Sequence, residues 1–433
     1  MNNSEKSFRK FLLLWLGELI SATGSGLTSF GLGVYVFQQT GKASAMALVT
    51  LLAFMPSLLL STVAGVLADR YDRRLLMMLG NILSTLGLTF ILIYMLCGEI
   101  QLWQICVGVT ISSVFSALLD SAYKATVSDM LTEGQYTKAS GLVQVAGSAK
   151  YLISPIIAGF LLTVSDIKLL LVIDIFTFFV TVASTLIVRN SFASKKYKQT
   201  KSFIHEFKDG WSAVSENRGV LVLVIMTSML TFSIGFIETL SMPMLLAFSD
   251  SSVVGTLETI VATGMLVSSV IIGILPIKKG YVKLLSLSLF FAGIFMAAFG
   301  LREDIVLICM SGFFFFAMMP FANTSLDFLV RTNIENELQG RAWGLIGLIS
   351  QLGFVAAYAV SGVLADYIFT PLLLDGGVLA GSVGKIIGTG SGRGTGFLII
   401  IAGIVLCVTA AILYNIKSIK KLESKDYLCV NTN

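Results

Sequence analysis

Long apolar runs separated by short polar connections form the dominant pattern of this chain. Crossing the hydrocarbon core of a membrane takes roughly 20 residues of helix, and twelve runs reach about that length. A helix satisfies its backbone hydrogen bonds internally, so it can span a membrane without closing into a barrel. The pattern therefore predicts an all-α membrane protein with about twelve transmembrane helices. The expected spans lie near residues 11–37, 44–68, 75–97, 102–122, 139–162, 168–188, 219–245, 253–276, 283–300, 304–323, 342–368 and 396–416.

The composition fits a protein whose solvent is the lipid bilayer. Of its 433 residues, 55% are hydrophobic and 13% are charged, whereas a soluble domain averages roughly 25% charged residues. The net charge of +5 is dispersed among the apolar runs, which argues against nucleic acid as a partner. The five cysteines lack CxxC spacing and the only histidine is His205. We therefore expect neither a disulfide framework nor a metal site, and no cofactor.

Lysine and arginine concentrate in alternate connections and at both ends of the chain. Cytoplasmic connections carry the excess of basic residues in membrane proteins, so we expect both termini on the cytoplasmic side of the cytoplasmic membrane. The longest cytoplasmic connection, 189–218, divides the chain into an N-terminal six-helix half (1–188) and a C-terminal six-helix half (219–433). Apolar residues at helical spacing from Phe203 to Val214 favour an amphipathic helix on the inner membrane surface over a solvated linker.

The two halves repeat the order of several small residues. Ala117 and Ala122, for example, recur as Ala317 and Ala322 on the equivalent expected helix. Such a repeat indicates duplication of a six-helix unit. Two six-helix halves with the substrate site between them are the layout of one large transporter architecture.

The connection between the second and third expected helices carries a charged motif. It reads Gly65-Val-Leu-Ala-Asp69-Arg70-Tyr-Asp-Arg73-Arg74. This motif resembles the signature of the major facilitator superfamily, although an aspartate stands where that family often has a glycine. Gly65 would let two helices approach closely, and the Asp69 carboxylate would pair with Arg70 or Arg73. We expect these residues and Arg74 to act as a conformational latch; the alternative is a basic anchor at the inner surface.

The fifth expected helix contains a proline among small residues. The segment Lys150-x-x-x-Ser154-Pro155-x-x-Ala158-Gly159 is similar to the antiporter motif of the same superfamily, with Ser154 and Ala158 in place of glycines. The pattern predicts a kinked, closely packed helix. The resemblance implies an exporter, and simple tight packing is the competing account.

Further stretches are similar to the branch of the superfamily that contains macrolide efflux proteins. They are Leu14-Trp-Leu-Gly-Glu18, residues 203–211, residues 217–219 and Gly340-Arg341. That branch often has glutamine or another polar residue where Glu18 stands. The resemblance implies drug:proton antiport, in which a proton gradient drives efflux of drug-like or other amphipathic small molecules.

Glu18 lies inside the first expected span, about 12 Å along the helix from Lys10. It shares a helical face with Ser21, Ser25 and Ser29, and this polar stripe should face a central cavity rather than lipid. Charged groups inside spans are costly and are functional candidates for that reason. A carboxylate there would take up and release protons as access to the cavity changes; the alternative is a structural role in a polar helix contact.

Lys150 lies near the middle of the fifth expected span, with Gly147 and Ser154 on its face. An unpaired lysine at that depth would be very costly. We therefore expect a cavity ion pair between Lys150 and Glu18 that protonation or substrate breaks.

Three further acids, Asp174, Glu238 and Glu258, lie toward the outer ends of their expected helices. Together they would form the outer end of a proton or cation path. For each of them, a role in helix packing or at a helix end is equally open.

The sequence thus favours a proton-coupled exporter whose partners are a small-molecule substrate, protons and membrane lipids, acting as a monomer. An importer or facilitator of a small metabolite is the alternative, because fold fixes neither direction nor substrate. A receptor or an enzyme is disfavoured. An enzyme needs converging catalytic groups, and the sequence has no HExxH or GxSxG motif.

Overall fold

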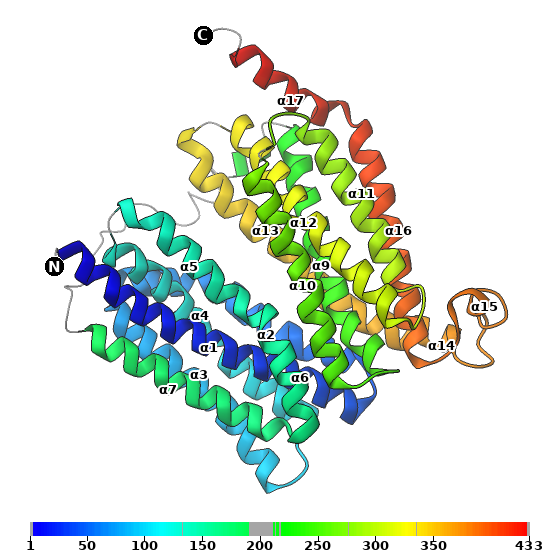
Figure 1. Ribbon diagram of the computed structural model, residues 1–433, viewed down its shortest axis with the longest axis horizontal. Coiled ribbons are helices and arrows are strands. Elements are labelled where there is room, and N and C mark those ends of the chain that lie inside the picture. The colour runs from blue at the N-terminus through cyan, green and yellow to red at the C-terminus, as the bar shows by residue number, and fades with distance from the viewer. Residues whose placement is uncertain are drawn as a thin grey trace. The chain divides into compact units, whose positions relative to one another are not determined.

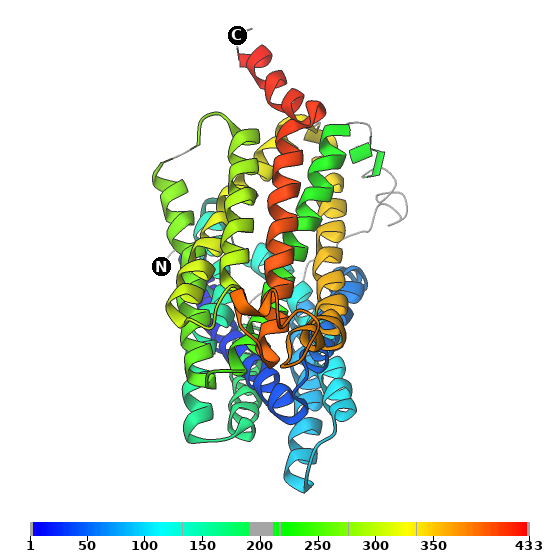
Figure 2. The ribbon, with the colours of Figure 1, turned by 90° about the vertical axis from the view of Figure 1, so that its right-hand side faces the viewer.

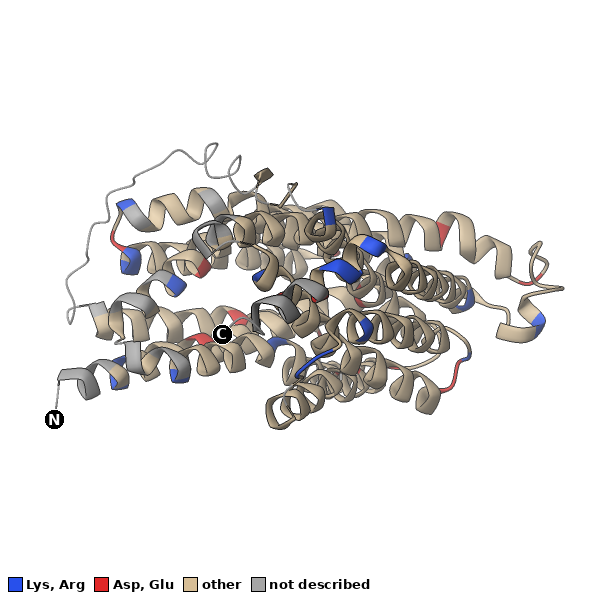
Figure 3. Cartoon of the chain, turned by 90° about the horizontal axis from the view of Figure 1, so that it is seen from above, with Lys and Arg blue, Asp and Glu red and all other residues tan. Residues whose placement is uncertain are grey.

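In the computed structural model, the protein is built of helices (Figure 1). The described residues are 3–131, 133–189, 211–212, 214–215, 218–275, 277–334 and 336–430. Within them no strand occurs, and twelve helices are long and apolar enough to cross a membrane. Each of these helices overlaps one of the expected spans, which confirms the all-α membrane fold. Charged residues, coloured in Figure 3, occupy a small part of the ribbon, as the composition requires.

The described chain forms two compact units. The first unit contains the helices up to residue 189, and residues Asp250–Thr259 pack with it. Its helices are α1 (Asn3–Thr40), α2 (Ala43–Arg70), α3 (Arg73–Cys97), α4 (Leu102–Met130), α5 (Glu133–Leu152), α6 (Ser154–Val164) and α7 (Ile167–Arg189).

The second unit contains the remaining described residues. Its elements are α9 (Arg218–Leu246), most of α10 (Ser251–Ile274), α11 (Tyr281–Phe299), α12 (Ile305–Asn333), α13 (Asn336–Leu364), a π-helical turn η1 (Ala365–Phe369), α14 (Thr370–Leu373), α15 (Gly384–Ile387), α16 (Ser391–Asn415) and α17 (Lys417–Val430).

The connection 189–218 lies mostly outside the described residues. Positions 211–212 and 214–215 are helical, whereas residues 203–210 of the predicted amphipathic helix are not described. The amphipathic helix, and the division of the chain into halves at this connection, therefore stay predictions.

Acidic side chains begin several of the helices. Asp72 accepts a hydrogen bond from the backbone N–H of Arg74 at 3.0 Å and so caps α3. Asp304 accepts from the N–H groups of Val306 and Leu307 at 2.8 and 3.1 Å at the start of α12. These carboxylates satisfy N–H groups that lack an intrahelical partner and complement the positive end of the helix dipole.

Glycines bring α11 and α16 into backbone contact in the second unit. Figure 2 shows the two helices side by side along much of their length. A Cβ atom at Gly403 would lie 2.6 Å from both the Gly293 carbonyl oxygen and the Ala297 nitrogen. Only glycine permits this approach, because carbon atoms in contact prefer separations of about 3.5–4.0 Å.

Candidate functional site

The connection between α2 and α3 is held by its own arginines. Arg73 Nε donates a hydrogen bond to the Ala68 carbonyl at 3.0 Å, which ties the start of α3 to the end of α2. The Arg73 and Arg74 side chains are buried, whereas Arg70 is exposed. Two of the three arginines of the predicted latch, Arg73 and Arg74, therefore pack into the first unit.

Gly65 does not have the close helix contact that the sequence suggested. A Cβ atom at this position would meet no atom within 4 Å, so α2 has open space there in this conformation. The Asp69 side chain lies outside the part of the structure that is described. Its pairing with Arg70 or Arg73, and the latch itself, stay predictions.

The membrane-spanning segment that contains Pro155 is broken. α5 ends at Leu152, Ile153 forms a turn and α6 begins at Ser154. Proline has no N–H to donate to the preceding turn, and its ring crowds that turn. The fully buried Ser154 hydroxyl donates to the Thr23 carbonyl of α1 at 2.9 Å. The kink expected from the sequence is thus present, and α1 supports it.

Gly159 provides close packing one turn beyond the break. A Cβ atom there would lie 2.5 Å from the Ser251 carbonyl oxygen and 3.3 Å from Gly255 Cα. Both belong to the start of α10, which is part of the same unit. A glycine at this position therefore lets the backbones of α6 and α10 touch.

Glycines spaced seven residues apart also hold α1 against α7. They are Gly17, Gly24 and Gly31. A Cβ atom at Gly24 would lie 2.9 Å from Oδ1 of Asp174, and one at Gly31 would lie 2.6 Å from a methyl carbon of Leu170. The missing side chain at Gly24 thus creates the space that the Asp174 carboxyl group occupies.

Asp174 is consequently buried in a helix interface. Its side chain is 1% exposed, and the Ser25 hydroxyl of α1 donates to its Oδ1 at 3.4 Å. The sequence placed this acid toward the outer end of a path. The structure places it within the α1–α7 contact of the first unit, next to Ser25 of the polar face of α1.

Lys150 stands in the last turn of α5. Its Nζ lies 5.9 Å from the centre of the Tyr151 ring, and its charge acts on Asp120 and Asp174. The described residues show no ion pair between Lys150 and Glu18. The expected cavity pair is therefore not formed in this conformation, and Asp174 takes the place of Glu18 as an acid influenced by this lysine.

Glu18 faces α4. Its Oε2 atom is buried and has no hydrogen-bond partner among the described residues. The charges that act on it are those of Asp120 and Lys124. Tyr123 is also influenced by the Glu18 charge, and its buried hydroxyl likewise lacks a partner in the described structure. A buried carboxylate oxygen without a partner is costly, which supports a functional role over a packing role.

The sequence did not assign these α4 residues to the surroundings of Glu18. Asp120 and Lys124 are four residues apart, so helical geometry places them on one face. That spacing is typical of a local pair within one helix, and it does not indicate which other helix the two residues meet. The three-dimensional contact of α1 and α4 adds Asp120 and Tyr123 to the candidate site.

The two remaining candidate acids, Glu238 and Glu258, have different surroundings. In the second unit, the Tyr358 hydroxyl of α13 donates to Glu238 Oε2 of α9 at 2.8 Å. Glu258 lies half-buried on α10, within the segment that packs with the first unit. Their place in a proton or cation path stays a prediction.

The second unit contains a pocket of about 410 Å³ between α9, α12 and α13. The Trp343 indole Nε1 is buried without a hydrogen-bond partner in the described structure. The Asp327 carboxylate is bonded to Arg331 at 2.8 Å, and the Arg331 guanidinium lies 5.3 Å from the Trp343 ring centre. The pocket thus combines apolar walls with a few polar groups, as binding sites for small molecules do. Its lining residues are Thr227, Asn323, Thr324, Leu326, Asp327, Val330, Trp343 and Ile346.

The chain is similar in sequence to proteins named as macrolide efflux proteins. Macrolide efflux protein A of Streptococcus pyogenes is 26% identical over 373 residues, which cover 83% of this chain and 90% of that protein. Macrolide efflux protein A of Enterococcus faecalis is 27% identical over 324 residues, covering 71% of this chain and 98% of that protein.

Solved structures share the fold at low sequence identity. The nucleoside transporter NupG has a TM-score of 0.72 at 13% identity and covers 94% of this chain and 100% of its own. A bacterial homologue of the human lysosomal transporter Spinster, in an inward-facing unoccupied conformation, has a TM-score of 0.71 at 13% identity, covering 97% of this chain and 98% of its own. At these identities the likeness shows the fold alone.

Twelve spanning helices among the described residues define a multi-pass membrane protein, and the match to a transporter family identifies its class as a transporter. The sequence profile of the Major Facilitator Superfamily matches residues 14–358. The chain belongs to this superfamily, and its partner is accordingly a small-molecule substrate.

Proposed function

We propose that this transporter exports drug-like or other amphipathic small molecules in exchange for protons. The macrolide efflux proteins that it resembles cover most of its length, which supports export of compounds of that kind. We further propose that it resides in the cytoplasmic membrane as a monomer, with both termini in the cytoplasm, because lysine and arginine gather in the connections on that side.

The observation that carries the proposal is the environment of Glu18. Among the described residues, its buried Oε2 has no hydrogen-bond partner and neither has the Tyr123 hydroxyl, on which the Glu18 charge acts; the charges of Asp120 and Lys124 act on Glu18 itself. Ionisable side chains inside spanning segments mark proton relays. A carboxyl group that is exposed in turn to the two sides of the membrane takes up a proton on one side and releases it on the other. Glu18 is thus a proton carrier in the proposal.

Asp174 is a second carboxyl group in the same unit. It is buried, accepts from Ser25 and is influenced by the charge of Lys150. Because it has these partners, its charge state depends on the α1–α7 contact and on the position of Lys150. The proposal assigns it a role in sensing the arrangement of α1, and Lys150 a role in balancing its charge.

The pocket of the second unit supplies the substrate contact in this proposal. Its volume of about 410 Å³ falls within the roughly 300–1,000 Å³ of pockets that hold drug-sized ligands. Trp343 offers a ring face and an indole N–H that has no partner among the described residues, and Asp327 offers a carboxylate at the wall. An apolar molecule with hydroxyl groups or an amine matches this lining.

The test is accumulation of a radiolabelled macrolide in cells that produce the protein. Cells with the wild-type chain should accumulate less label than empty cells, and a protonophore should remove the difference. Glu18→Gln keeps the size of the side chain and removes its titration, so it should abolish export. Glu303→Gln makes the same chemical change at an exposed connection between α11 and α12 and should leave export unchanged.

The outcomes separate the proposal from its alternative. Higher accumulation in cells with the wild-type chain would show import or facilitated entry. Lower accumulation that persists with a protonophore would remove the proton from the mechanism. Equal export by Glu18→Gln and Glu303→Gln would remove Glu18 from it.

A further inference from the structure

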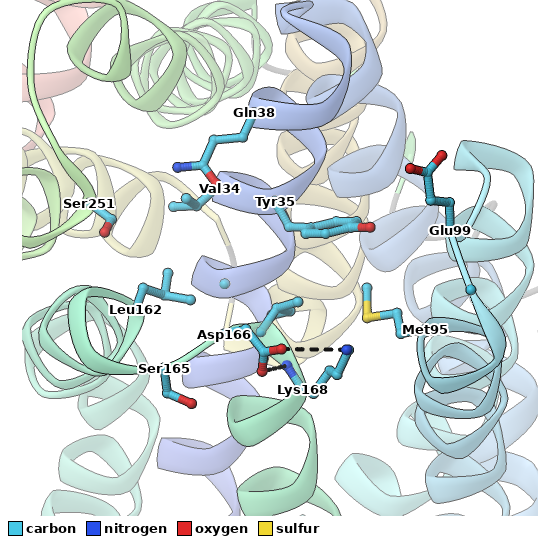
Figure 4. A pocket seen from close by; sticks show the side chains of 13 residues that line it. Val34, Tyr35, Gln38, Met95, Glu99, Leu162, Ser165, Asp166, Lys168 and Ser251 are labelled. Carbon is cyan, nitrogen blue, oxygen red and sulfur yellow. Dashed lines mark hydrogen bonds and ion pairs between the residues drawn. The ribbon is translucent and has the colours of Figure 1, made fainter.

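A second pocket, of about 340 Å³, lies in the first unit at the end of α1 that is remote from the N-terminus. It is formed by α1, the connection between α3 and α4, and the connection between α6 and α7 (Figure 4). Of the pocket residues on α1, Gly31 is the one nearest to Glu18. It lies thirteen positions further along the chain, which corresponds to about 20 Å along the helix. This pocket is therefore separate from the proton-carrying group.

The charges at this pocket leave one carboxylate unmatched. Asp166 and Lys168 form an ion pair at 3.6 Å, and Asp166 also accepts from the Lys168 backbone N–H at 3.1 Å. Glu99 lines the opposite side on the connection between α3 and α4. The described residues give Glu99 no ion-pair partner. The lining thus has a net charge of one negative unit, carried by an exposed carboxylate.

Aromatic and apolar groups stand next to that carboxylate. Figure 4 shows the Tyr35 side chain extending from α1 toward the connection that contains Glu99, and the Glu99 charge acts on the Tyr35 phenol. Met95 and Leu162 add apolar surface to the lining. A carboxylate beside an aromatic ring is the arrangement that attracts an organic cation, because the ion pair and the face of the ring both stabilise positive charge.

We propose that this pocket binds an ammonium group attached to a small apolar body. Glu99 pairs with the ammonium, the Tyr35 ring covers it, and Met95 and Leu162 contact the apolar part. The ammonium belongs either to a free organic cation or to the headgroup of a lipid. The proposal does not depend on the direction of transport or on proton coupling, since it concerns binding at a different place.

Equilibrium binding of radiolabelled benzylammonium to the purified full-length protein in detergent tests the proposal. Benzyl alcohol, which has nearly the same size and no charge, should bind much more weakly. Glu99→Gln should weaken benzylammonium binding about tenfold, the usual effect of losing a hydrogen bond to a charged group. Tyr35→Leu should weaken it about threefold, and Tyr35→Phe should restore most of the loss because it keeps the ring.

Two control variants test whether the effect is specific to Glu99 among the acidic residues. Glu303→Gln should bind benzylammonium like the wild type, and so should Glu18→Gln. Glu99→Gln should elute and unfold like the wild type, because Glu99 is exposed and its replacement leaves no buried gap. Equal binding of benzylammonium and benzyl alcohol would overturn the proposal. So would wild-type affinity in Glu99→Gln, or loss of binding in Glu18→Gln alone.

Nanodiscs identify the source of the ammonium. If a lipid headgroup occupies the pocket, phosphatidylethanolamine discs should lower the affinity of the wild type for benzylammonium relative to phosphatidylglycerol discs, and Glu99→Gln should show no such difference. If free cations are the ligand, the wild-type affinity should be the same in both discs. Either result supports an ammonium site, provided that Glu99→Gln weakens binding.

Discussion

Replacing Gly403 with alanine inserts one methyl group into the backbone contact between α11 and α16. The new Cβ atom would lie 2.6 Å from the Gly293 carbonyl oxygen and 2.6 Å from the Ala297 nitrogen. Both are backbone atoms of α11, so neither can rotate away as a side chain would. The helices must therefore move apart.

The size of the effect follows from that separation. Ordinary contacts of about 3.5 Å require a shift of roughly 1 Å, and such a gap removes a quarter to a half of each dispersion contact along the interface. Overpacking of this kind costs about 3 kcal/mol at the upper end of its usual range. Alanine regains about 1 kcal/mol through its higher helix propensity. We expect Gly403→Ala to lower the stability of the second unit by about 2 kcal/mol.

Gly344→Ala is the matched control. Gly344 lies inside α13 of the same unit, and a Cβ atom there would meet no atom within 4 Å. This variant should be as stable as the wild type or gain up to about 1 kcal/mol. The midpoints of thermal unfolding in detergent should differ by about 6–12 °C between the two variants. Equal midpoints, or a Gly403→Ala protein as stable as the wild type, would refute the reasoning.

Three further predictions concern polar groups. Arg393→Lys should lower the midpoint of thermal unfolding. The buried guanidinium donates two hydrogen bonds, of 2.8 and 2.9 Å, to the carbonyls at the end of α11, and a single ammonium cannot reproduce both. An unchanged midpoint would contradict this. Tyr358→Phe should destabilise the protein by about 1–2 kcal/mol in the same unfolding assay, because it removes the hydrogen bond to Glu238. Tyr414→Phe, at an exposed position, should leave the stability unchanged. Trp343→Phe keeps an aromatic ring and removes the indole N–H, so macrolide affinity should fall about threefold to tenfold in equilibrium binding. Wild-type affinity in this variant would exclude the N–H from substrate contact.

Local chemistry explains which features the sequence could predict. The twelve spans follow from apolar length alone, and the break before Ser154 follows from the missing N–H of Pro155. Both depend on residues within one turn or one helix. The small residue Gly159 also met its expected role, because a close helix contact is what a glycine inside a span commonly serves.

Pairing between helices was harder to predict. Glu18 and Lys150 were expected to form an ion pair because both are charged and lie well inside their spans. The sequence, however, does not show how far apart the side chains of α1 and α5 lie. The structure instead sets Glu18 against α4 and buries Asp174 where Gly24 leaves space. The seven-residue spacing of glycines on α1 was a signal that could have indicated the α1–α7 contact. Gly65 has open space around it in this conformation, so its expected close helix contact stays a prediction.

The central claim is that proton movement and substrate movement are coupled through Glu18. The most direct measurement uses purified protein in proteoliposomes that enclose a pH-sensitive dye, with an outward or inward macrolide gradient imposed at equal pH. The wild type should move protons against the direction of macrolide flow, and Glu18→Gln should bind macrolide without moving protons. Macrolide-driven proton flux at the wild-type rate in Glu18→Gln, or its absence in the wild type, would contradict the account.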